Sequence, residues 1–144
     1  MKRWQKRLLL AAGILLLLLL AASRSYLTPD TIPGVTFSVE DGSVTRKGMT
    51  LTIRNGAGAE LTYGAEYHLE KRGLLGWRHL WENFLPTGWN AIGYIVSPDD
   101  SRVDDFSWTG RYGELSPGTY RMVRTYTLEG EAYSVAVEFT VPGS

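Results

Sequence analysis

The fold is specified most clearly by residues 115–141, which read LSPGTYRMVRTYTLEGEAYSVAVEFTV. Polar and apolar side chains alternate along two long runs, Gly118–Leu128 and Glu131–Val141. Such alternation is typical of a strand with one buried and one exposed face, and the short glycine-containing connection between the runs is typical of a hairpin. These residues therefore predict two long antiparallel strands joined by a tight turn.

A tyrosine stands at the beginning of the first run. Tyr120 follows a Pro117-Gly118 turn. This is the position of the tyrosine corner in an immunoglobulin-like sandwich, where the hydroxyl bonds to backbone a few residues upstream. We therefore assign structural roles to Tyr120, Pro117 and Gly118, and we expect an all-β fold, an immunoglobulin-like antiparallel β-sandwich.

Earlier segments repeat the two-residue period. Val35–Val39, Met49–Ile53 and Ala65–Leu69 each alternate between apolar and polar side chains. The body from residue 34 to residue 144 is 111 residues long, close to the roughly 100 residues of such a sandwich. Because the chain contains no cysteine, its core depends on packed aromatic and aliphatic side chains alone.

The N-terminus has the pattern of an export signal. Residues 1–7 carry four basic side chains, and residues 8–22 form an uncharged run of 15 small and apolar residues. A helix needs about 20 residues to cross a bilayer comfortably, and Ala21-Ala22-Ser23 offers small residues for signal cleavage. We interpret residues 1–23 as a cleaved signal peptide, with an uncleaved membrane anchor as the alternative. In both cases the remaining chain is delivered outside the cytoplasm.

Residues 24–33 separate this segment from the body. Pro29 and Pro33 disfavour helix and strand there. We therefore expect a short polar linker, followed by a sandwich domain at residues 34–144.

Charge and motifs exclude several classes of function. Four of the 15 basic side chains lie in the first 23 residues, which leaves a net charge of −4 on the remainder and argues against nucleic acid as a partner. The absence of cysteine excludes a thiol nucleophile, a thiolate zinc site and a lipidated N-terminal cysteine. No Gly-x-Ser-x-Gly elbow, dinucleotide-binding glycine motif or phosphate loop occurs. We therefore expect no enzymatic activity, no catalytic residue and no cofactor.

Two groups of residues are weak candidates for a metal site. Glu66 and His68, together with Glu70, project from one face of an expected strand, and His79 could join them from the next strand. The second group has the oxygen ligands that calcium prefers and comprises Asp99, Asp100, Asp104 and Asp105. For the first group we favour a solvated outer face over a metal, and for the second we favour acids that flank turns.

The body also contains four tryptophans. We assign Trp77 and Trp108 to the core, because a sandwich without disulfides can enlarge its core with buried aromatic rings. For Trp81 and Trp89 two roles stay open: core packing, or a platform with Tyr94 that stacks sugar rings.

Two features break the pattern. Strict alternation from Tyr120 places Arg124 on the buried face, and since no nearby acid is an obvious partner, we predict a β-bulge that turns Arg124 outward. Leu74 and Leu75 lie in a tight turn between two glycines, where water would reach both side chains. We favour contact with residues 81–85 and keep an external partner or lipid surface as the alternative.

Several short motifs follow one another along the body: Tyr63-Gly64, Tyr67-x-Leu69-Glu70-Lys71, Gly76-Trp77, Ala91-Ile92-Gly93-Tyr94, Trp108 and Tyr112-Gly113-Glu114-Leu115-x-Pro117-Gly118-x-Tyr120-Arg121. Over residues 53–141 this order resembles the bacterial Ig-like domain family of exported proteins, often lipoproteins, from Gram-positive bacteria. The resemblance implies an extracytoplasmic β-sandwich and no catalytic residues. The sequence departs from the family at Ser23, where a lipoprotein would carry its cysteine, and at the leucine pair.

These features predict a non-catalytic exported protein for adhesion, envelope association or ligand binding. It would be secreted, or anchored to the outer face of the cell membrane through residues 8–22, and its partner would be a protein or a cell-envelope ligand. One alternative is a small extracytoplasmic metal-dependent binder or enzyme that uses Glu66, His68 and the Asp99–Asp105 loop. Another is a membrane-tethered accessory partner of a membrane protein.

Overall fold

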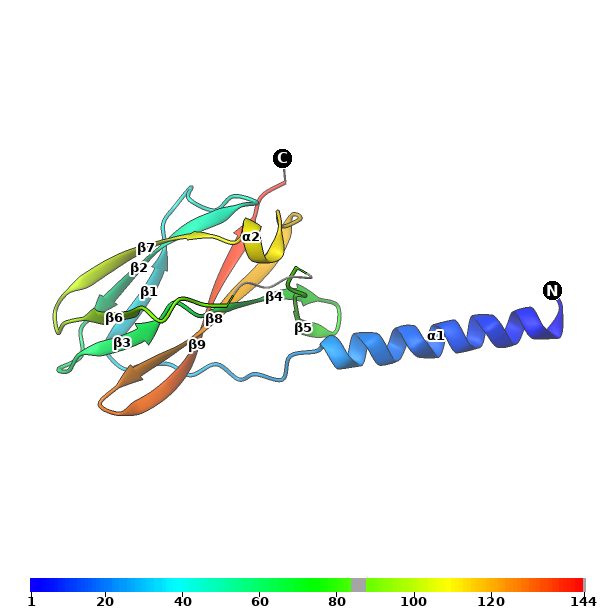
Figure 1. Ribbon diagram of the computed structural model, residues 1–144, viewed down its shortest axis with the longest axis horizontal. Helices are drawn as coiled ribbons and strands as arrows, with labels where there is room; N and C mark the ends of the chain where they lie inside the picture. Colours follow the sequence, from blue (N-terminus) through cyan, green and yellow to red (C-terminus); the bar gives the residue numbers. More distant parts are fainter. Residues whose placement is uncertain (84–87, 144) are drawn as a thin grey trace.

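The computed structural model describes residues 1–83 and 88–143, in which a long helix projects from a β-sandwich (Figure 1). Helix α1 spans Arg3–Ser23. The other elements are β1 (Val35–Val39), β2 (Gly48–Asn55), β3 (Leu61–Gly64), β4 (His68–Gly73), β5 (Gly76–His79), β6 (Gly93–Val96), β7 (Ser101–Ser107), the short α2 (Thr109–Tyr112), β8 (Gly118–Leu128) and β9 (Glu131–Val141). The predicted all-β sandwich with an apolar N-terminal helix is confirmed.

The strands form two antiparallel sheets. The smaller sheet has the order β1-β2-β7, and the larger one has the order β5-β4-β8-β3-β6, with β9 paired to β8. Because β9 pairs along the whole of β8, strands β3 and β4 share the other edge of β8. There β4 lies opposite Tyr120–Val123 and β3 lies opposite Tyr126–Leu128. Beyond β8, the larger sheet is therefore divided into a β4–β5 half and a β3–β6 half (Figure 1).

The β8–β9 hairpin has the predicted form. Its register runs one-to-one from Gly118 opposite Val141 to Leu128 opposite Glu131. Glu129 and Gly130, the two residues of the turn, have φ angles of 52° and 80°. Positive φ at both central residues is typical of the two-residue turn whose twist matches that of the flanking strands.

The core lies between the two sheets and contains two clusters of buried side chains. The first includes Leu51, Ile53, Leu61 and Tyr126; the second includes Trp108, Tyr120, Met122 and Phe139. Trp108 is fully buried, stacks on Phe139 with ring centroids 5.2 Å apart, and donates its indole N–H to the Arg46 carbonyl at 2.9 Å. The hydroxyl of Tyr120 donates to the Ser116 carbonyl at 2.7 Å, which is the bond of a tyrosine corner.

Trp77 does not belong to this core, contrary to the sequence prediction. It is half-buried on the outer face of the β4–β5 half, where the Arg121 guanidinium lies 4.6 Å from its ring centroid. The alternation of a four-residue strand shows which side chains share a face, but it does not show which face the second sheet covers.

The predicted bulge at Arg124 is also wrong. β8 and β9 pair one-to-one through this residue, and its side chain is only 5% exposed. Its carboxylate partner is Asp104 of β7, with 3.1 Å between Nη1 and Oδ2. Met122 and Val123 are adjacent and both buried, because both faces of β8 are covered at this point.

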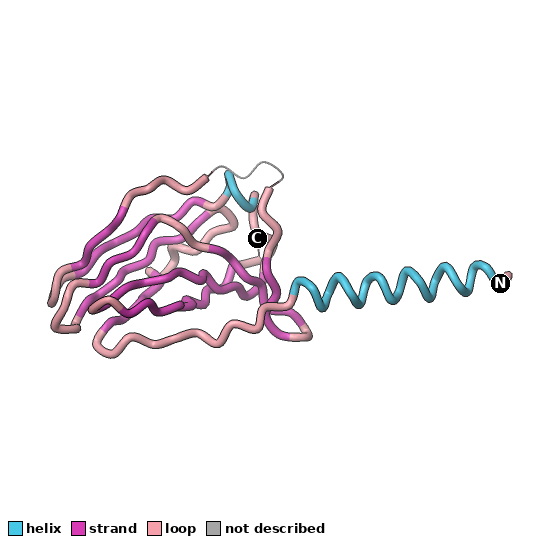
Figure 2. The backbone as a smooth tube through the Cα atoms, turned by 60° about the horizontal axis from the view of Figure 1, so that its bottom comes forward, coloured by secondary structure: helices cyan, strands magenta, loops and turns pink. Residues whose placement is uncertain are grey.

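The segment between α1 and β1 is bound to the sandwich and is not a free linker. Arg24 forms a β-bridge with Arg78, and the Ser25 N–H donates to the Trp77 carbonyl at 2.8 Å. Further along, the Asp30 N–H donates to the Ser134 carbonyl, also at 2.8 Å. Figure 2 shows this segment running along the sandwich before it enters β1.

Candidate functional site

An open groove lies where the larger sheet divides. Its volume is about 1130 Å³, and it runs between the β3–β6 half, the β4–β5 half and the chain after α1. We call it the split groove; its lining includes Tyr26, Thr62, His68, His79, Asn90, Tyr94 and Ile95. Aromatic rings, hydroxyl groups, an amide and two imidazoles thus border one concave surface.

Arg124 lines the split groove from the core side. Its guanidinium lies 4.5 Å from the ring centroid of Tyr63, and the Tyr63 hydroxyl donates to Asp104 Oδ2 at 2.7 Å. Burial and the hydrogen bond to Asp104 raise the pKa of Tyr63, so its hydroxyl stays protonated and keeps donating. Among the described residues, Arg124 Nε has no hydrogen-bond partner. The Arg124–Asp104 pair is therefore tightly enclosed, with one donor left unsatisfied.

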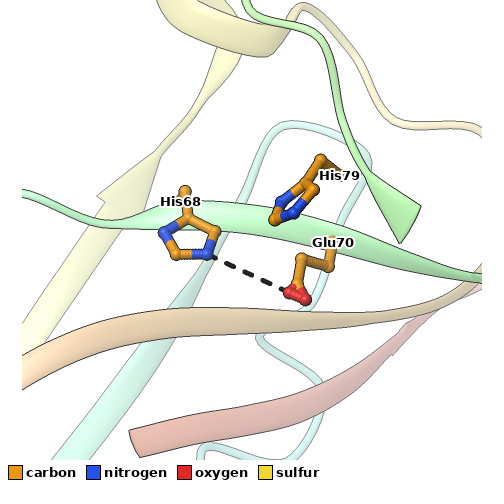
Figure 3. Close-up of side chains that lie close together, drawn as sticks. All are labelled: His68, Glu70 and His79. Atoms are coloured by element: carbon orange, nitrogen blue, oxygen red, sulfur yellow. Dashed lines mark ion pairs between the residues drawn. The ribbon is translucent and has the colours of Figure 1, made fainter. Parts of the chain in front are cut away.

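On the β4–β5 half, two histidines and a glutamate come together (Figure 3). Glu70 and His79 are opposite each other in the β4–β5 register, and His68 precedes Glu70 by two residues on the same face. His68 Nε2 lies 4.0 Å from Glu70 Oε2, and the two imidazole rings are 5.9 Å apart. Within residues 1–83 and 88–143 this is the one group of three such side chains close enough to share a metal ion. Glu66, a sequence candidate, is not part of it.

Glu70 is already held by an arginine. Its side chain is fully buried, and Arg121 donates to Oε1 from Nη2 at 2.9 Å and from Nε at 3.2 Å. The same Nη2 lies 3.3 Å from the Leu27 carbonyl and 3.4 Å from Ser25 Oγ. Trp77 and the segment after α1 thus seal the Glu70–Arg121 pair from solvent.

Charges in this cluster are fixed by the ion pair. Burial opposes ionisation of Glu70, but hydrogen bonds from Arg121 and Ser25 outweigh it and hold the pKa of Glu70 below its ordinary value. Burial lowers the pKa of His68 below its ordinary 6.5, and the nearby His79 and Arg121 add to the shift. His68 is therefore neutral at pH 7, while Glu70 is ionised.

This arrangement suits an ion pair better than a metal centre. Two imidazoles and a carboxylate could supply three of the four ligands of zinc. However, the charge of Glu70 is neutralised by Arg121, whose guanidinium lies against the carboxylate and would repel a dication. We therefore assign Glu70 and Arg121 a structural role.

The four aspartates proposed for calcium do not converge. Asp99 and Asp100 lie in the turn between β6 and β7, whereas Asp104 and Asp105 are consecutive residues of β7 and point to opposite faces. Asp104 binds Arg124, and Asp105 accepts a hydrogen bond from the Thr50 hydroxyl at 2.6 Å. These carboxylates serve turns and strand pairing, and they do not form a calcium loop.

A comparison with known protein families matches residues 31–140 to the bacterial Ig-like domain family. The chain belongs to this family. A search of curated proteins found no match. Domains of this family are typically extracellular and non-enzymatic, in keeping with the predicted non-catalytic character.

The tryptophans of the Ig-like domain have different surroundings. Trp89 packs on Tyr67 with ring centroids 5.0 Å apart, and the Arg111 guanidinium lies 3.7 Å from the centroid of the Trp89 ring. Trp81 is largely exposed. Of the two tryptophans for which the sequence left both core packing and sugar stacking possible, Trp89 is engaged in packing and also lines the split groove.

The leucine pair of the Ig-like domain is exposed. Leu74 and Leu75 form the turn between β4 and β5; Leu74 is fully exposed and Leu75 is 64% exposed. The predicted contact with residues 81–85 concerns a segment of which 84 and 85 lie outside the described residues, and the described residues do not cover the pair.

The sequence does not reveal the ion pairs of this Ig-like domain, because their partners are far apart in the chain. Glu70 and Arg121 are separated by 51 residues. Both residues stand where the alternation of their strands expects a polar side chain, so no local anomaly marks them as buried. Only the β4–β8 register places one opposite the other.

Proposed function

We propose that this protein is a non-catalytic binding module, held at the outer face of the cell membrane by α1, that recognises a cell-wall saccharide in the split groove. Tyrosine and tryptophan rings along the groove can stack on sugar rings, and its threonine, asparagine and histidine side chains can hydrogen-bond to sugar hydroxyls. The site requires no cofactor.

The observation that carries the proposal is the direct junction of α1 with the domain. Ser23 ends the helix and Ser25 follows it by two residues, and both are buried against the sandwich. Ser25 and Leu27 also contact the Arg121 guanidinium. The chain around the predicted cleavage site thus contributes to the fold, which favours retention of α1 as an anchor.

α1 itself has the properties of an anchor. It is long and apolar enough to cross a membrane, and almost none of it is buried by the rest of the chain. The basic residues before the apolar run would keep the N-terminus on the cytoplasmic side. The domain, at the other end of α1, would then face outward.

The test is co-sedimentation of the full-length chain, in lipid nanodiscs, with insoluble purified cell-wall polysaccharide. Ile95→Asp places a charge on the rim of the split groove, and Val103→Asp is a matched control on β7, because both residues are 59% exposed. We expect Ile95→Asp to lose binding at least tenfold while Val103→Asp binds like the wild type. No binding by the wild type, or equal binding by all three proteins, would refute the saccharide site.

A further inference from the structure

Two adjacent leucines stand free at the tip of the β4–β5 hairpin. Gly73 and Gly76 pair with each other, so Leu74 and Leu75 form a two-residue turn that cannot fold back onto the sheet. Gly76 has a φ of 97°, a backbone conformation that residues other than glycine rarely adopt. Two apolar side chains are thereby fixed in an exposed position, which is typical of a surface that contacts another apolar phase.

The tip lies beside the C-terminal end of α1. Arg24, the first residue after the helix, bridges to Arg78, and the next N–H, from Ser25, binds the Trp77 carbonyl. The two residues of β5 that make these contacts, Trp77 and Arg78, lie within two residues of Gly76. Figures 1 and 2 show, from two directions, the β4–β5 turn next to the place where α1 leaves the sandwich.

α1 leaves little distance between a membrane and this tip. The whole of α1 is long enough to cross a membrane, but its uncharged apolar run, residues 8–22, is only about 22 Å long at 1.5 Å per residue. The hydrocarbon core of a bilayer is about 30 Å thick. A span that is too short draws its flanking residues toward the interface. Since Ser23 is already buried against the sandwich, the flanking residues on the outer side belong to the domain itself.

The charges around the tip suit an anionic lipid surface. Glu70 is the sole acid of residues 68–79, and it is neutralised by Arg121. Arg24, Arg72 and Arg78 are basic residues of the hairpin and of the chain joined to it. Tyr26 is 76% exposed, with the Arg24 guanidinium 5.1 Å from its ring centroid. Arginine, tyrosine and leucine at one site are typical of the membrane interface, although the chain after residue 23 is acidic as a whole.

We propose that Leu74 and Leu75 insert into the outer leaflet beside α1, while Arg24, Arg72 and Arg78 bind anionic lipid headgroups. This inference rests on the proposed function in one respect, because it requires α1 to be retained in the membrane. Attachment at two points would fix the orientation of the sandwich and hold the split groove at a constant height above the bilayer.

The experiment uses the natural absence of cysteine. Full-length Leu74→Cys and the control Val103→Cys, each labelled with the same environment-sensitive fluorophore, are reconstituted into vesicles of phosphatidylglycerol and phosphatidylcholine with nitroxide-labelled lipids. We expect a blue shift and several-fold stronger quenching at position 74 than at position 103. Weaker quenching at position 74 in pure phosphatidylcholine would support the role of the arginines, and unchanged quenching would refute it.

Flotation of the same vesicles separates the two proposals. If the chain floats with the lipid but position 74 is quenched no more than position 103, lipid insertion of the tip is refuted while the membrane anchor stands. If the chain does not float, the anchor is refuted, and the inference falls with it. An unlabelled readout excludes an effect of the dye: amide exchange of residues 73–76 should slow on vesicles for the wild type but not for the combined Leu74→Ser and Leu75→Ser variant.

Discussion

Arg121 and Arg124 lie three residues apart on β8 and are buried on opposite faces of the same strand. Arg124 points into the core and pairs with Asp104 of the other sheet. Arg121 points away from the core, pairs with Glu70 of the neighbouring strand and is covered by the chain that follows α1. The first pair is buried by the sandwich itself. The second is buried because the N-terminal segment closes over a face that would otherwise meet water.

The two ion pairs differ in what remains around each arginine when its carboxylate is lost. A buried ion pair contributes little net stability compared with apolar residues, but removing one partner leaves an uncompensated charge. Arg121 has the Leu27 carbonyl, Ser25 Oγ and the Trp77 ring as further partners. Arg124 has aromatic rings around it, and its Nε has no acceptor among the described residues. Removing the Asp104 carboxylate, on the inner face, should therefore lower the free energy of unfolding more than removing the Glu70 carboxylate on the outer face.

The largest effect is expected for Asp104→Asn. This change leaves the charge of Arg124 unneutralised between the sheets and also removes the charged acceptor of the Tyr63 hydroxyl. We expect a loss of about 3–5 kcal/mol in the free energy of unfolding, measured by urea denaturation of the full chain in detergent. Asp105→Asn, on the exposed side of the same strand, is the control. A loss below that of Glu70→Gln would contradict the ranking of the two faces.

Glu70→Gln should have a smaller effect, about 1.5–3 kcal/mol, because Arg121 keeps its other acceptors. The pH dependence identifies the cause. The pKa of Glu70 is lower in the folded state than its ordinary 4.5, so the folded state binds fewer protons between these two values. Stability contributed by this carboxylate is present above pH 4.5 and is lost as the pH falls through the folded-state value. Glu70→Gln should lack this part of the acid unfolding, and an unchanged acid profile would show that Glu70 does not cause it.

Ser25→Ala tests the cover over the outer pair. The change removes a hydroxyl that lies 3.4 Å from Arg121 Nη2 but keeps the backbone bond to Trp77. We expect a loss of about 0.5–1 kcal/mol, together with faster hydrogen exchange of the amides in β5. Ser38→Ala, on β1 of the other sheet, serves as the control. Equal effects of the two changes would mean that the segment after α1 does not cover the pair in solution.

The combined Leu74→Ser and Leu75→Ser variant should show the smallest change in stability, within about 0.5 kcal/mol, because both side chains are already exposed. This variant shows how much the free energy of unfolding changes when exposed residues of the β4–β5 hairpin are replaced, for comparison with the buried Glu70 on the same hairpin. A loss above 1 kcal/mol by the same denaturation assay would indicate that the leucines pack against the chain in solution.

Local pattern in the sequence was enough to predict the β8–β9 hairpin, because alternation and a Glu-Gly turn depend on neighbouring residues. The tyrosine corner followed for the same reason, since Tyr120 and Ser116 are four residues apart. The position of Trp77 and the burial of Arg124 could not be predicted in this way. Both depend on which face is covered, and in each case the partners lie on strands distant in the chain.

The candidate site shows the same division. His68 and Glu70 were recognisable as residues on one face of a strand, and His79 as a neighbour from the next strand. The strand pattern did not show that Arg121 lies beside Glu70. Because Arg121 forms an ion pair with this carboxylate, the cluster does not act as a metal site.

By itself, the sequence determined the apolar N-terminal helix, the β-sandwich and the absence of recognisable catalytic motifs, because each depends on composition or on spacing within a few residues. The tertiary structure alone decided that the chain after α1 is part of the folded domain, that the larger sheet divides beyond β8, and that two arginines find carboxylates on separate strands. The physical reason is that burial and charge compensation are properties of surfaces brought together by folding. They depend on strand register and on covering segments, and neither leaves a local pattern in the chain.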